Sequence, residues 1–198
     1  MFEQPLVTFF IGQSGCGKGT QADLLENRLK ELDPPRKMFR LETGDTFREF
    51  ITGSSYTARL TKQLMDHGKL VPPFLAVHVW SHLLIEGYQG DQHVLFDGTP
   101  RVFAEVAALD SAIHFYNWRP HVIFLNVSDG WARKRLGERQ RADDQEASDV
   151  EERLHWFHTS VIPVIQYLQT TPPYIFHEIN GEQAIEQVHA DIKKALNI

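Results

Sequence analysis

Short, almost continuous apolar runs alternate along the chain with longer segments of helical periodicity. Runs that are apolar on both faces are typical of parallel strands covered by helices on both sides. The apolar runs predict five strands, at 6–11, 38–42, 93–97, 121–127 and 174–179. The periodic segments predict helices at 18–32, 46–51, 56–67, 74–87, 102–117, 129–140, 149–170 and 183–196. This alternation indicates an α/β fold with a parallel sheet, in which ligands bind beyond the C-terminal ends of the strands.

The alternation continues through the chain without an internal repeat, a low-complexity segment or a linker. A chain of 198 residues is long enough to bury one sizeable core, so we expect a single domain at 1–198. The segment 43–72 places several helices between the second and third strands. We expect it to form a small helical lobe over the edge of the sheet.

A glycine-rich stretch, GQSGCGKGT at 12–20, directly follows the first predicted strand. Its spacing Gly12-x-x-x-x-Gly17-Lys18, with a strand before it and a helix after it, is that of a phosphate-binding loop. Glycines let main-chain N–H groups approach a ligand closely, and the helix N-terminus and the lysine both favour an anion. The hydroxyl residue usually found directly after the lysine is replaced by Gly19, and Thr20 follows.

Charged and polar residues also follow the other strands. The second strand is followed by TGDTFR, the third ends in DGTPR, and a basic helix reading WARKRLGERQRADD follows the fourth. Several separate arginines therefore fall where a ligand is expected, and the planar guanidinium fork suits phosphate oxygens. Phosphoryl transfer requires mainly such positioning and charge stabilisation. Asp97 is placed to orient magnesium directly or through water, and capping the following helix is the alternative reading.

Overall charge and composition exclude several other classes of protein. The net charge of −6 and the absence of a basic tail argue against general nucleic-acid binding. No apolar stretch approaches the length that spans a bilayer, and the N-terminus does not resemble a signal peptide. One cysteine excludes an internal disulfide framework and a multi-cysteine zinc site. We therefore expect a cytoplasmic protein without a membrane partner.

The motifs GQSGCGKGT, TGDTFRE, GKLVPP, DGTPR, RLGER and RADDQE, the last followed by Arg153, occur in one order along the chain. In this set the chain resembles the adenylate kinase branch of the nucleoside monophosphate (NMP) kinases, of the short-lid type. The resemblance implies a five-stranded parallel sheet flanked by helices, the P-loop NTPase fold. It also implies an NMP-binding lobe at about 43–72 and a very short lid at about 136–144. Such enzymes transfer a phosphoryl group from MgATP to an NMP.

The resemblance assigns roles to individual residues. It implies ATP binding by Gly15, Cys16, Gly17, Lys18, Gly19, Thr20, Arg135 and Arg139. It implies NMP binding by Thr43, Gly44, Arg48, Lys69, Leu70, Val71, Gly98, Arg101, Glu105, Arg141 and Arg153. Catalytic roles fall to Lys18, Asp97, Arg101, Arg139, Arg141 and Arg153, and Asp97 and Thr20 would hold Mg²⁺ only through water. A monomer is expected, because short family members are commonly monomeric.

Two departures from the family pattern leave the acceptor and the activity open. Glu105 stands where adenylate kinases typically carry a glutamine that reads adenine. AMP is the first-choice acceptor, which would make the chain an adenylate kinase that converts MgATP and AMP into two ADP by direct in-line transfer, and Thr43 keeps the adenylate-like choice. A carboxylate only accepts hydrogen bonds, so GMP, CMP or a deoxy-NMP is the alternative, unless Glu105 is simply an exposed helix residue. Only Gln140 separates Arg139 from Arg141, so the lid is shorter than expected. A nucleotide-binding regulatory protein without turnover is therefore a further alternative, although the acceptor-side arginines argue against it.

Overall fold

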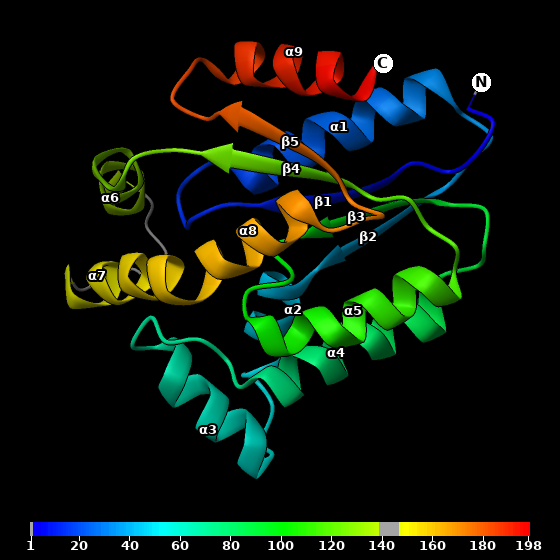
Figure 1. The fold of residues 1–198 in the computed structure, drawn as a ribbon. Helices are drawn as coiled ribbons and strands as arrows, with labels where there is room; N and C mark the ends of the chain where they lie inside the picture. The colour runs from blue at the N-terminus through cyan, green and yellow to red at the C-terminus, as the bar shows by residue number, and fades with distance from the viewer. Residues whose placement is uncertain (1, 139–146) are drawn as a thin grey trace.

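The computed structural model describes residues 2–138 and 147–198, and its centre is a five-stranded parallel sheet (Figure 1). Each predicted strand is confirmed to within one residue. The strands are β1 (Val7–Ile11), β2 (Met38–Glu42), β3 (His93–Asp97), β4 (His121–Asn126) and β5 (Ile175–Asn180), in the order β2-β3-β1-β4-β5. Because β1 lies between β3 and β4, the chain passes to opposite sides of β1 as it builds the sheet, and a crevice forms at such a switch in strand order.

Helices cover both faces of the sheet (Figure 1). Their bounds are α1 (Lys18–Leu32), α2 (Thr43–Phe50), α3 (Tyr56–Met65), α4 (Pro73–Gly87), α5 (Phe103–Phe115), α6 (Asp129–Glu138), α7 (Ala147–Trp156), α8 (Ile162–Thr170) and α9 (Ile185–Leu196). One face packs against α1, α6 and α9, and the other against α4, α5 and α8. The predicted α/β fold, a parallel sheet flanked by helices, is confirmed.

Successive side chains of β1 enter different cores, which explains why the strand is apolar except for the buried Thr8. Phe9 stacks on Phe96 at 4.4 Å between ring centroids, in the core formed with α4, α5 and α8. Phe10 points to the other side and packs in the core formed with α1 and α9. Both phenylalanines are almost completely buried. Burial on two faces therefore favours the almost continuous apolar run seen in β1.

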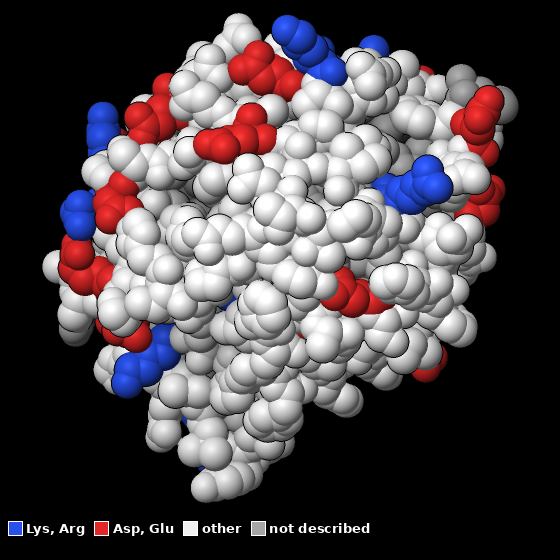
Figure 2. Space-filling view, viewed as in Figure 1, with Lys and Arg blue, Asp and Glu red and all other residues white. Residues whose placement is uncertain are grey.

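The surface over α4, α5 and α8 is mainly uncharged (Figure 2). Exposed aromatic side chains such as Phe103 and Phe115 contribute to it from the two ends of α5. Lysines, arginines and carboxylates gather mostly towards the edges of this view. The charges that could bind a phosphate therefore lie elsewhere, at the C-terminal edge of the sheet.

The segment between β2 and β3 has a small apolar core of its own. Phe47 of α2 packs with Leu75 and Val79 of α4, and Met65 of α3 joins this cluster. Helix α2 begins directly at Thr43, three residues earlier than predicted. The short helix therefore starts where β2 ends and brings the residues of TGDTFR to the sheet edge.

The single helix predicted at 149–170 is interrupted, so that prediction was wrong in detail. A π-helical segment, η2 (Phe157–Val161), separates α7 from α8. Pro163 lies in the first turn of α8 and has no N–H to donate to the carbonyl four residues earlier. A wider turn before a proline relieves this local mismatch. The sequence pattern was continuous because the buried positions keep helical spacing across the interruption.

The predicted lid at 136–144 falls largely outside the described residues, as do the candidate residues Arg139 and Arg141. The described part of the chain contains no helix that is both long and apolar enough to cross a membrane.

Candidate active site

The glycine-rich loop joins β1 to α1 at the C-terminal edge of the sheet. Gly17 is the N-cap of α1 and has φ 97°, a left-handed conformation that favours glycine. The ammonium of Lys18 lies over the loop and donates hydrogen bonds to the carbonyls of Gly12 at 2.8 Å and Gln13 at 3.0 Å. The N-terminal amides of α1 and one lysine charge therefore converge at the loop, as anion binding requires.

One open cleft of about 500 Å³ begins at this loop and extends over the ends of β2 and β3. Its walls come from the segment 14–21, the β2–α2 junction, the turn after α3, the end of β3, α6, α7 and the β5–α9 connection. These segments are far apart in the sequence. The parallel sheet brings them together because the C-terminal ends of its strands meet at the same edge.

Three guanidinium groups line one part of the cleft. They belong to Arg48 of α2, Arg101 after β3 and Arg153 of α7. Burial lowers the pKa of Arg101, and the nearby charges of Arg153 and Arg48 lower it further, although the carboxylates of Glu105 and Asp97 oppose this. Arginines that lie close enough to repel one another favour an anion between them.

The side chain of Arg101 is fixed in this cluster by two contacts. Its Nε donates a 2.8 Å hydrogen bond to the carbonyl of Gly98. Its guanidinium lies 5.8 Å from the ring centroid of Trp156, at cation–π distance. The terminal nitrogens of Arg101 are thereby held at the cleft, of which Arg101 is a lining residue.

A fourth guanidinium lies on another wall. Arg135 of α6 stacks 5.2 Å from the ring centroid of Trp131, and both side chains line the cleft. The connection after β5 adds Gly181, Gln183 and Ile185 to the lining. This end of the cleft thus combines a cation with aromatic and apolar surface.

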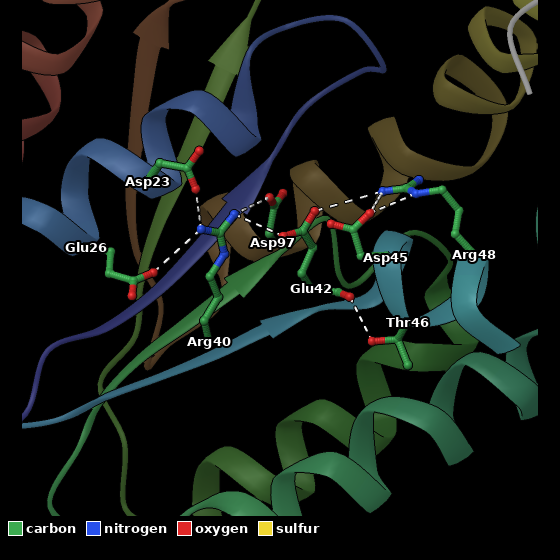
Figure 3. Close-up of polar contacts among 8 residues, drawn as sticks. All are labelled: Asp23, Glu26, Arg40, Glu42, Asp45, Thr46, Arg48 and Asp97. Carbon is green, nitrogen blue, oxygen red and sulfur yellow. Dashed lines mark hydrogen bonds and ion pairs between the residues drawn. The ribbon is translucent and has the colours of Figure 1, made fainter. Parts of the chain in front are cut away.

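Carboxylates occupy the sheet edge beneath the cleft (Figure 3). Asp97 ends β3 and is 7% exposed, and its Oδ2 faces the start of α1, 3.7 Å from where a Cβ on Gly19 would lie. Glu42 is the register partner of Asp97 on β2. Burial, a hydrogen bond with Asp45 and the charge of Asp97 raise the pKa of Glu42 to about 7, although Arg40 acts in the opposite direction.

The family model described as adenylate kinase matches residues 10–172. The chain belongs to the adenylate kinase family. It is 29% identical over 192 residues to an adenylate kinase of Flavobacterium psychrophilum, covering 94% of this chain and 96% of that protein. It is 30% identical over 190 residues to adenylate kinase isoenzyme 1 of Caenorhabditis elegans, covering 93% of this chain and 84% of that protein.

Most of the candidate residues that the structure describes line this cleft. The lining includes Gly15, Cys16, Gly17, Lys18, Gly19, Thr20, Gly44, Arg48, Lys69, Val71, Asp97, Arg101, Arg135 and Arg153. Gly98 lines a smaller neighbouring cavity. Thr43, Leu70 and Glu105 are not among the lining residues in the described part of the chain. Thr43 is buried and accepts a hydrogen bond from Thr99 at 3.2 Å, and Leu70 packs against the core.

Glu105 is only 3% exposed in this structure, so it is not the exposed helix residue considered from the sequence. Its Oε1 accepts hydrogen bonds from the backbone N–H groups of Arg101 at 3.1 Å and Val102 at 3.3 Å. The carboxylate therefore caps the first turn of α5 and supports the turn that carries Arg101. Burial raises the pKa of Glu105, and these backbone bonds lower it.

Several residues that line this adenylate kinase family site were not recognised from the sequence. Glu42, Trp131 and Trp156 line the cleft, as do residues of the β5–α9 connection. The position of that connection, directly after a strand end, was a usable signal. The tryptophans gave no such signal, because an aromatic residue on a helix more often packs in a core.

Proposed function

We propose that this chain transfers the γ-phosphoryl group of MgATP directly to AMP, which yields two molecules of ADP. The observation that carries the proposal is the shared cleft, in which the loop of Lys18 and the guanidiniums of Arg48, Arg101 and Arg153 line one space. Membership of the adenylate kinase family supports the same reaction. A protein that only bound ATP would have no use for a separate arginine cluster beside the phosphate-binding loop.

On the donor side, the loop amides at the start of α1 and the ammonium of Lys18 bind the β- and γ-phosphates. Arg135, which lines the same cleft, provides a further positive charge for the ATP phosphates. The ring of Trp131 and the side chain of Ile185 offer apolar surface for the rest of the nucleotide. Arg139, outside the described residues, remains a predicted donor-side arginine.

On the acceptor side, Arg48 and Arg101 bind the α-phosphate of the monophosphate, and Arg153 stabilises charge on the group in transfer. Two guanidiniums from separate elements position that phosphate for attack on the γ-phosphorus, and such positioning supplies much of the rate enhancement. The wall formed by Phe47, Met65 and Val71 accommodates the base. The segment 43–72 thus serves as the proposed NMP-binding lobe, and Arg141 remains a predicted contact.

The residues present fit a magnesium ion that travels with ATP. Magnesium prefers oxygen ligands and usually keeps several of its waters. Asp97 is placed to orient such waters, because its Oδ2 faces the first turn of α1 near Gly19. Thr20, in the same turn, provides the second proposed water contact. When bound, the ion would neutralise negative charge on the phosphate oxygens during transfer.

The structure does not favour the other acceptors considered from the sequence. GMP, CMP and deoxy-NMPs were considered because Glu105 replaces a glutamine that reads adenine, but here that carboxylate accepts two backbone hydrogen bonds. The regulatory alternative is also weaker, because the acceptor-side arginines share the cleft with the loop. A monomeric state and a cytoplasmic setting remain predictions.

The test is a coupled assay of ADP formation with MgATP and a panel of AMP, GMP, CMP, UMP and the corresponding deoxy-NMPs. We expect the highest kcat/KM with AMP. Turnover with GMP and not with AMP would overturn the acceptor assignment. Absence of turnover with every acceptor, although ATP binds, would leave only the regulatory alternative.

A further inference from the structure

Arg40 lies in the middle of β2, and its guanidinium joins this strand to α1 and β3 (Figure 3). Its Nη1 forms ion pairs with Asp23 and Glu26 of α1, the latter at 3.5 Å. Its Nη2 lies 3.0 Å from Oε2 of Glu42 and 3.7 Å from Oδ2 of Asp97. One cation is therefore surrounded by four carboxylates, and its side chain is only 21% exposed.

Glu42 lies between two guanidiniums, one on each side. Its Oε2 binds Arg40, whereas its Oε1 lies 4.0 Å from Nη2 of Arg48 (Figure 3). Arg48 also donates from Nε to Oδ1 of Asp45 at 2.8 Å. The closer of the two Glu42 contacts is thus with Arg40, and the contact with Arg48 is at the limit of an ion pair.

We propose that Arg40 is a positioning residue for the acceptor phosphate, because it holds the Glu42 carboxylate on the side of α1 and keeps it from pairing closely with Arg48. This inference rests on the proposed function, in which Arg48 binds that phosphate. Arg40 does not line the cleft, and its proposed effect on Arg48 is exerted through Glu42.

The charges around Glu42 explain why its position depends on Arg40. Asp97 from β3 and Asp45 from α2 are its acidic neighbours, and both raise the pKa of Glu42. Without Arg40, Arg48 is the nearest remaining guanidinium of this cluster. An attractive cation draws a carboxylate strongly in a partly buried site, where charges are poorly screened. Because Arg40 also lowers the pKa of Glu42, this pKa rises without Arg40, so Glu42 competes with the acceptor phosphate for the same guanidinium only at a pH well above 7. The measurements below are therefore made at such a pH, where Glu42 stays charged.

The strength of this competition sets the size of the expected effect. A phosphate that must displace one extra carboxylate from Arg48 loses roughly tenfold in affinity, the usual scale for one charge-assisted contact. ATP binds at the loop of Lys18 and does not use Arg48. The affinity for AMP should therefore fall, whereas the affinity for ATP should stay the same.

The experiment compares Arg40→Gln with Arg40→Gln/Glu42→Gln. Binding of AMP alone is followed by isothermal titration calorimetry, and kcat and the two KM values by the coupled assay. For Arg40→Gln we expect about tenfold increases in the Kd and KM for AMP, with kcat and the KM for ATP within about twofold. The second substitution removes the competing charge and should restore the AMP values. Arg40→Lys, which keeps the charge, should lie closer to the wild type.

The matched control is Arg36→Gln. Arg36 is also a largely buried arginine beside β2, 13% exposed, with ion pairs to Asp33 at 2.6 Å and Asp91 at 3.1 Å, but it lies away from the cleft. A merely structural role for Arg40 predicts that both variants lower the melting temperature and leave the affinity for AMP unchanged. Circular dichroism and thermal melts establish that each variant is folded.

The inference is overturned if Arg40→Gln weakens ATP and AMP equally, or if the double variant binds AMP as weakly as the single variant. A melting temperature restored in the double variant without restored AMP affinity also overturns it. If the wild type binds AMP but shows no turnover, the proposed function fails while the Kd series still tests Arg40. If the wild type binds no AMP, both fail.

Discussion

Trp156 donates a 2.9 Å hydrogen bond from its indole Nε1 to the carbonyl of Gly68. This bond joins α7 to the turn that follows α3, and both segments line the cleft. The two segments approach so closely that a Cβ on Gly68 would lie 2.5 Å from the carbonyl oxygen of Asp149, and Gly68 has φ 63°. The guanidinium of Arg101 lies 5.8 Å from the centroid of the same indole ring. Trp156 therefore links the shape of the cleft to the placement of an arginine.

Replacing Trp156 by phenylalanine removes the indole N–H and leaves the Gly68 carbonyl without this donor. We expect the free energy of unfolding to fall by about 1–3 kcal/mol, the cost of a lost buried hydrogen bond. The KM for AMP should rise as well, because the ring under Arg101 is smaller. Urea denaturation and the coupled assay measure the two effects. Trp118→Phe is the control, since Trp118 lies away from the cleft and its N–H···O distance to Tyr88 is 3.4 Å. Equal effects of both variants on the KM would contradict the prediction.

Replacing Lys18 by methionine removes the one lysine charge of the phosphate-binding loop. We expect kcat to fall by at least about a hundredfold, as when a preorganised group that stabilises the transition state is lost. Circular dichroism should remain unchanged, because the bonds of the Lys18 ammonium within residues 2–138 and 147–198 go to two carbonyls and the thiol of its own loop. Lys30→Met, at an exposed position of the same helix, is the matched control and should retain activity. A normal kcat in Lys18→Met would refute the assigned site.

Replacing Arg101 by alanine should lower kcat/KM for AMP by at least about a hundredfold, because a charge-assisted phosphate contact and its orientation are both lost. Arg101→Lys should recover only part of this, since an ammonium cannot bind Gly98 through Nε and a phosphate through its terminal nitrogens at once. Arg133→Ala, at an exposed arginine paired with Glu151, serves as the control. Steady-state kinetics with AMP as the varied substrate measures these effects. Wild-type values of kcat/KM for Arg101→Ala would exclude a role of Arg101 in binding AMP.

Glu42 makes the stability of the protein depend on pH in a defined direction. Its pKa is raised from 4.5 to about 7 in the folded chain, so the folded state holds the proton more tightly than the unfolded state. The resulting stabilisation is fully present below pH 4.5 and is lost as the pH rises through about 7. Glu42→Gln should therefore match the wild type in acid and become the more stable protein above pH 7. Urea denaturation at several pH values tests this, and a difference that does not vary with pH would show that Glu42 does not titrate in this way.

Glu105→Gln should leave the order of preference among acceptors unchanged. The amide oxygen of glutamine can accept the same two backbone hydrogen bonds as the carboxylate. Glu105→Leu removes both bonds and should cost about 1–2 kcal/mol of stability, as expected for a lost cap. The acceptor panel and urea denaturation separate these effects. A gain of AMP over GMP in Glu105→Gln would show that this residue reads the base after all.

The fold could be predicted from the sequence because burial on two faces leaves a plain pattern. Phe9 and Phe10 enter different cores, so Thr8 is the one polar residue of β1. Similar, mainly apolar runs located the other four strands. The loop of Lys18 was recognisable because its function fixes both residue types and spacing. Pro163 was the visible reason for an interruption of the helix at 149–170, but periodicity alone could not show where the turn would widen.

The contacts between distant residues could not be predicted in the same way. Nothing in LETGD indicates that Glu42 faces Arg40 on one side and Arg48 on the other, because this depends on the register of β2 against β3. The family resemblance predicts that Glu105 reads the base, because adenylate kinases typically carry an adenine-reading glutamine at this position. In the structure, the Glu105 carboxylate instead accepts hydrogen bonds from backbone N–H groups at the start of α5, which need an acceptor.

The π-helical segment at Phe157–Val161 determines how α7 is rotated about the helix axis relative to α8. The helix before it presents Arg153 and Trp156 to the cleft, and the helix after it seats Val164 and Leu168 in the core. One residue corresponds to about 100° of turn in an α-helix. Deleting one residue of this segment would leave every residue that lines the cleft in the sequence. It would nevertheless rotate α7 relative to α8, so that the guanidinium of Arg153 no longer faced the cleft.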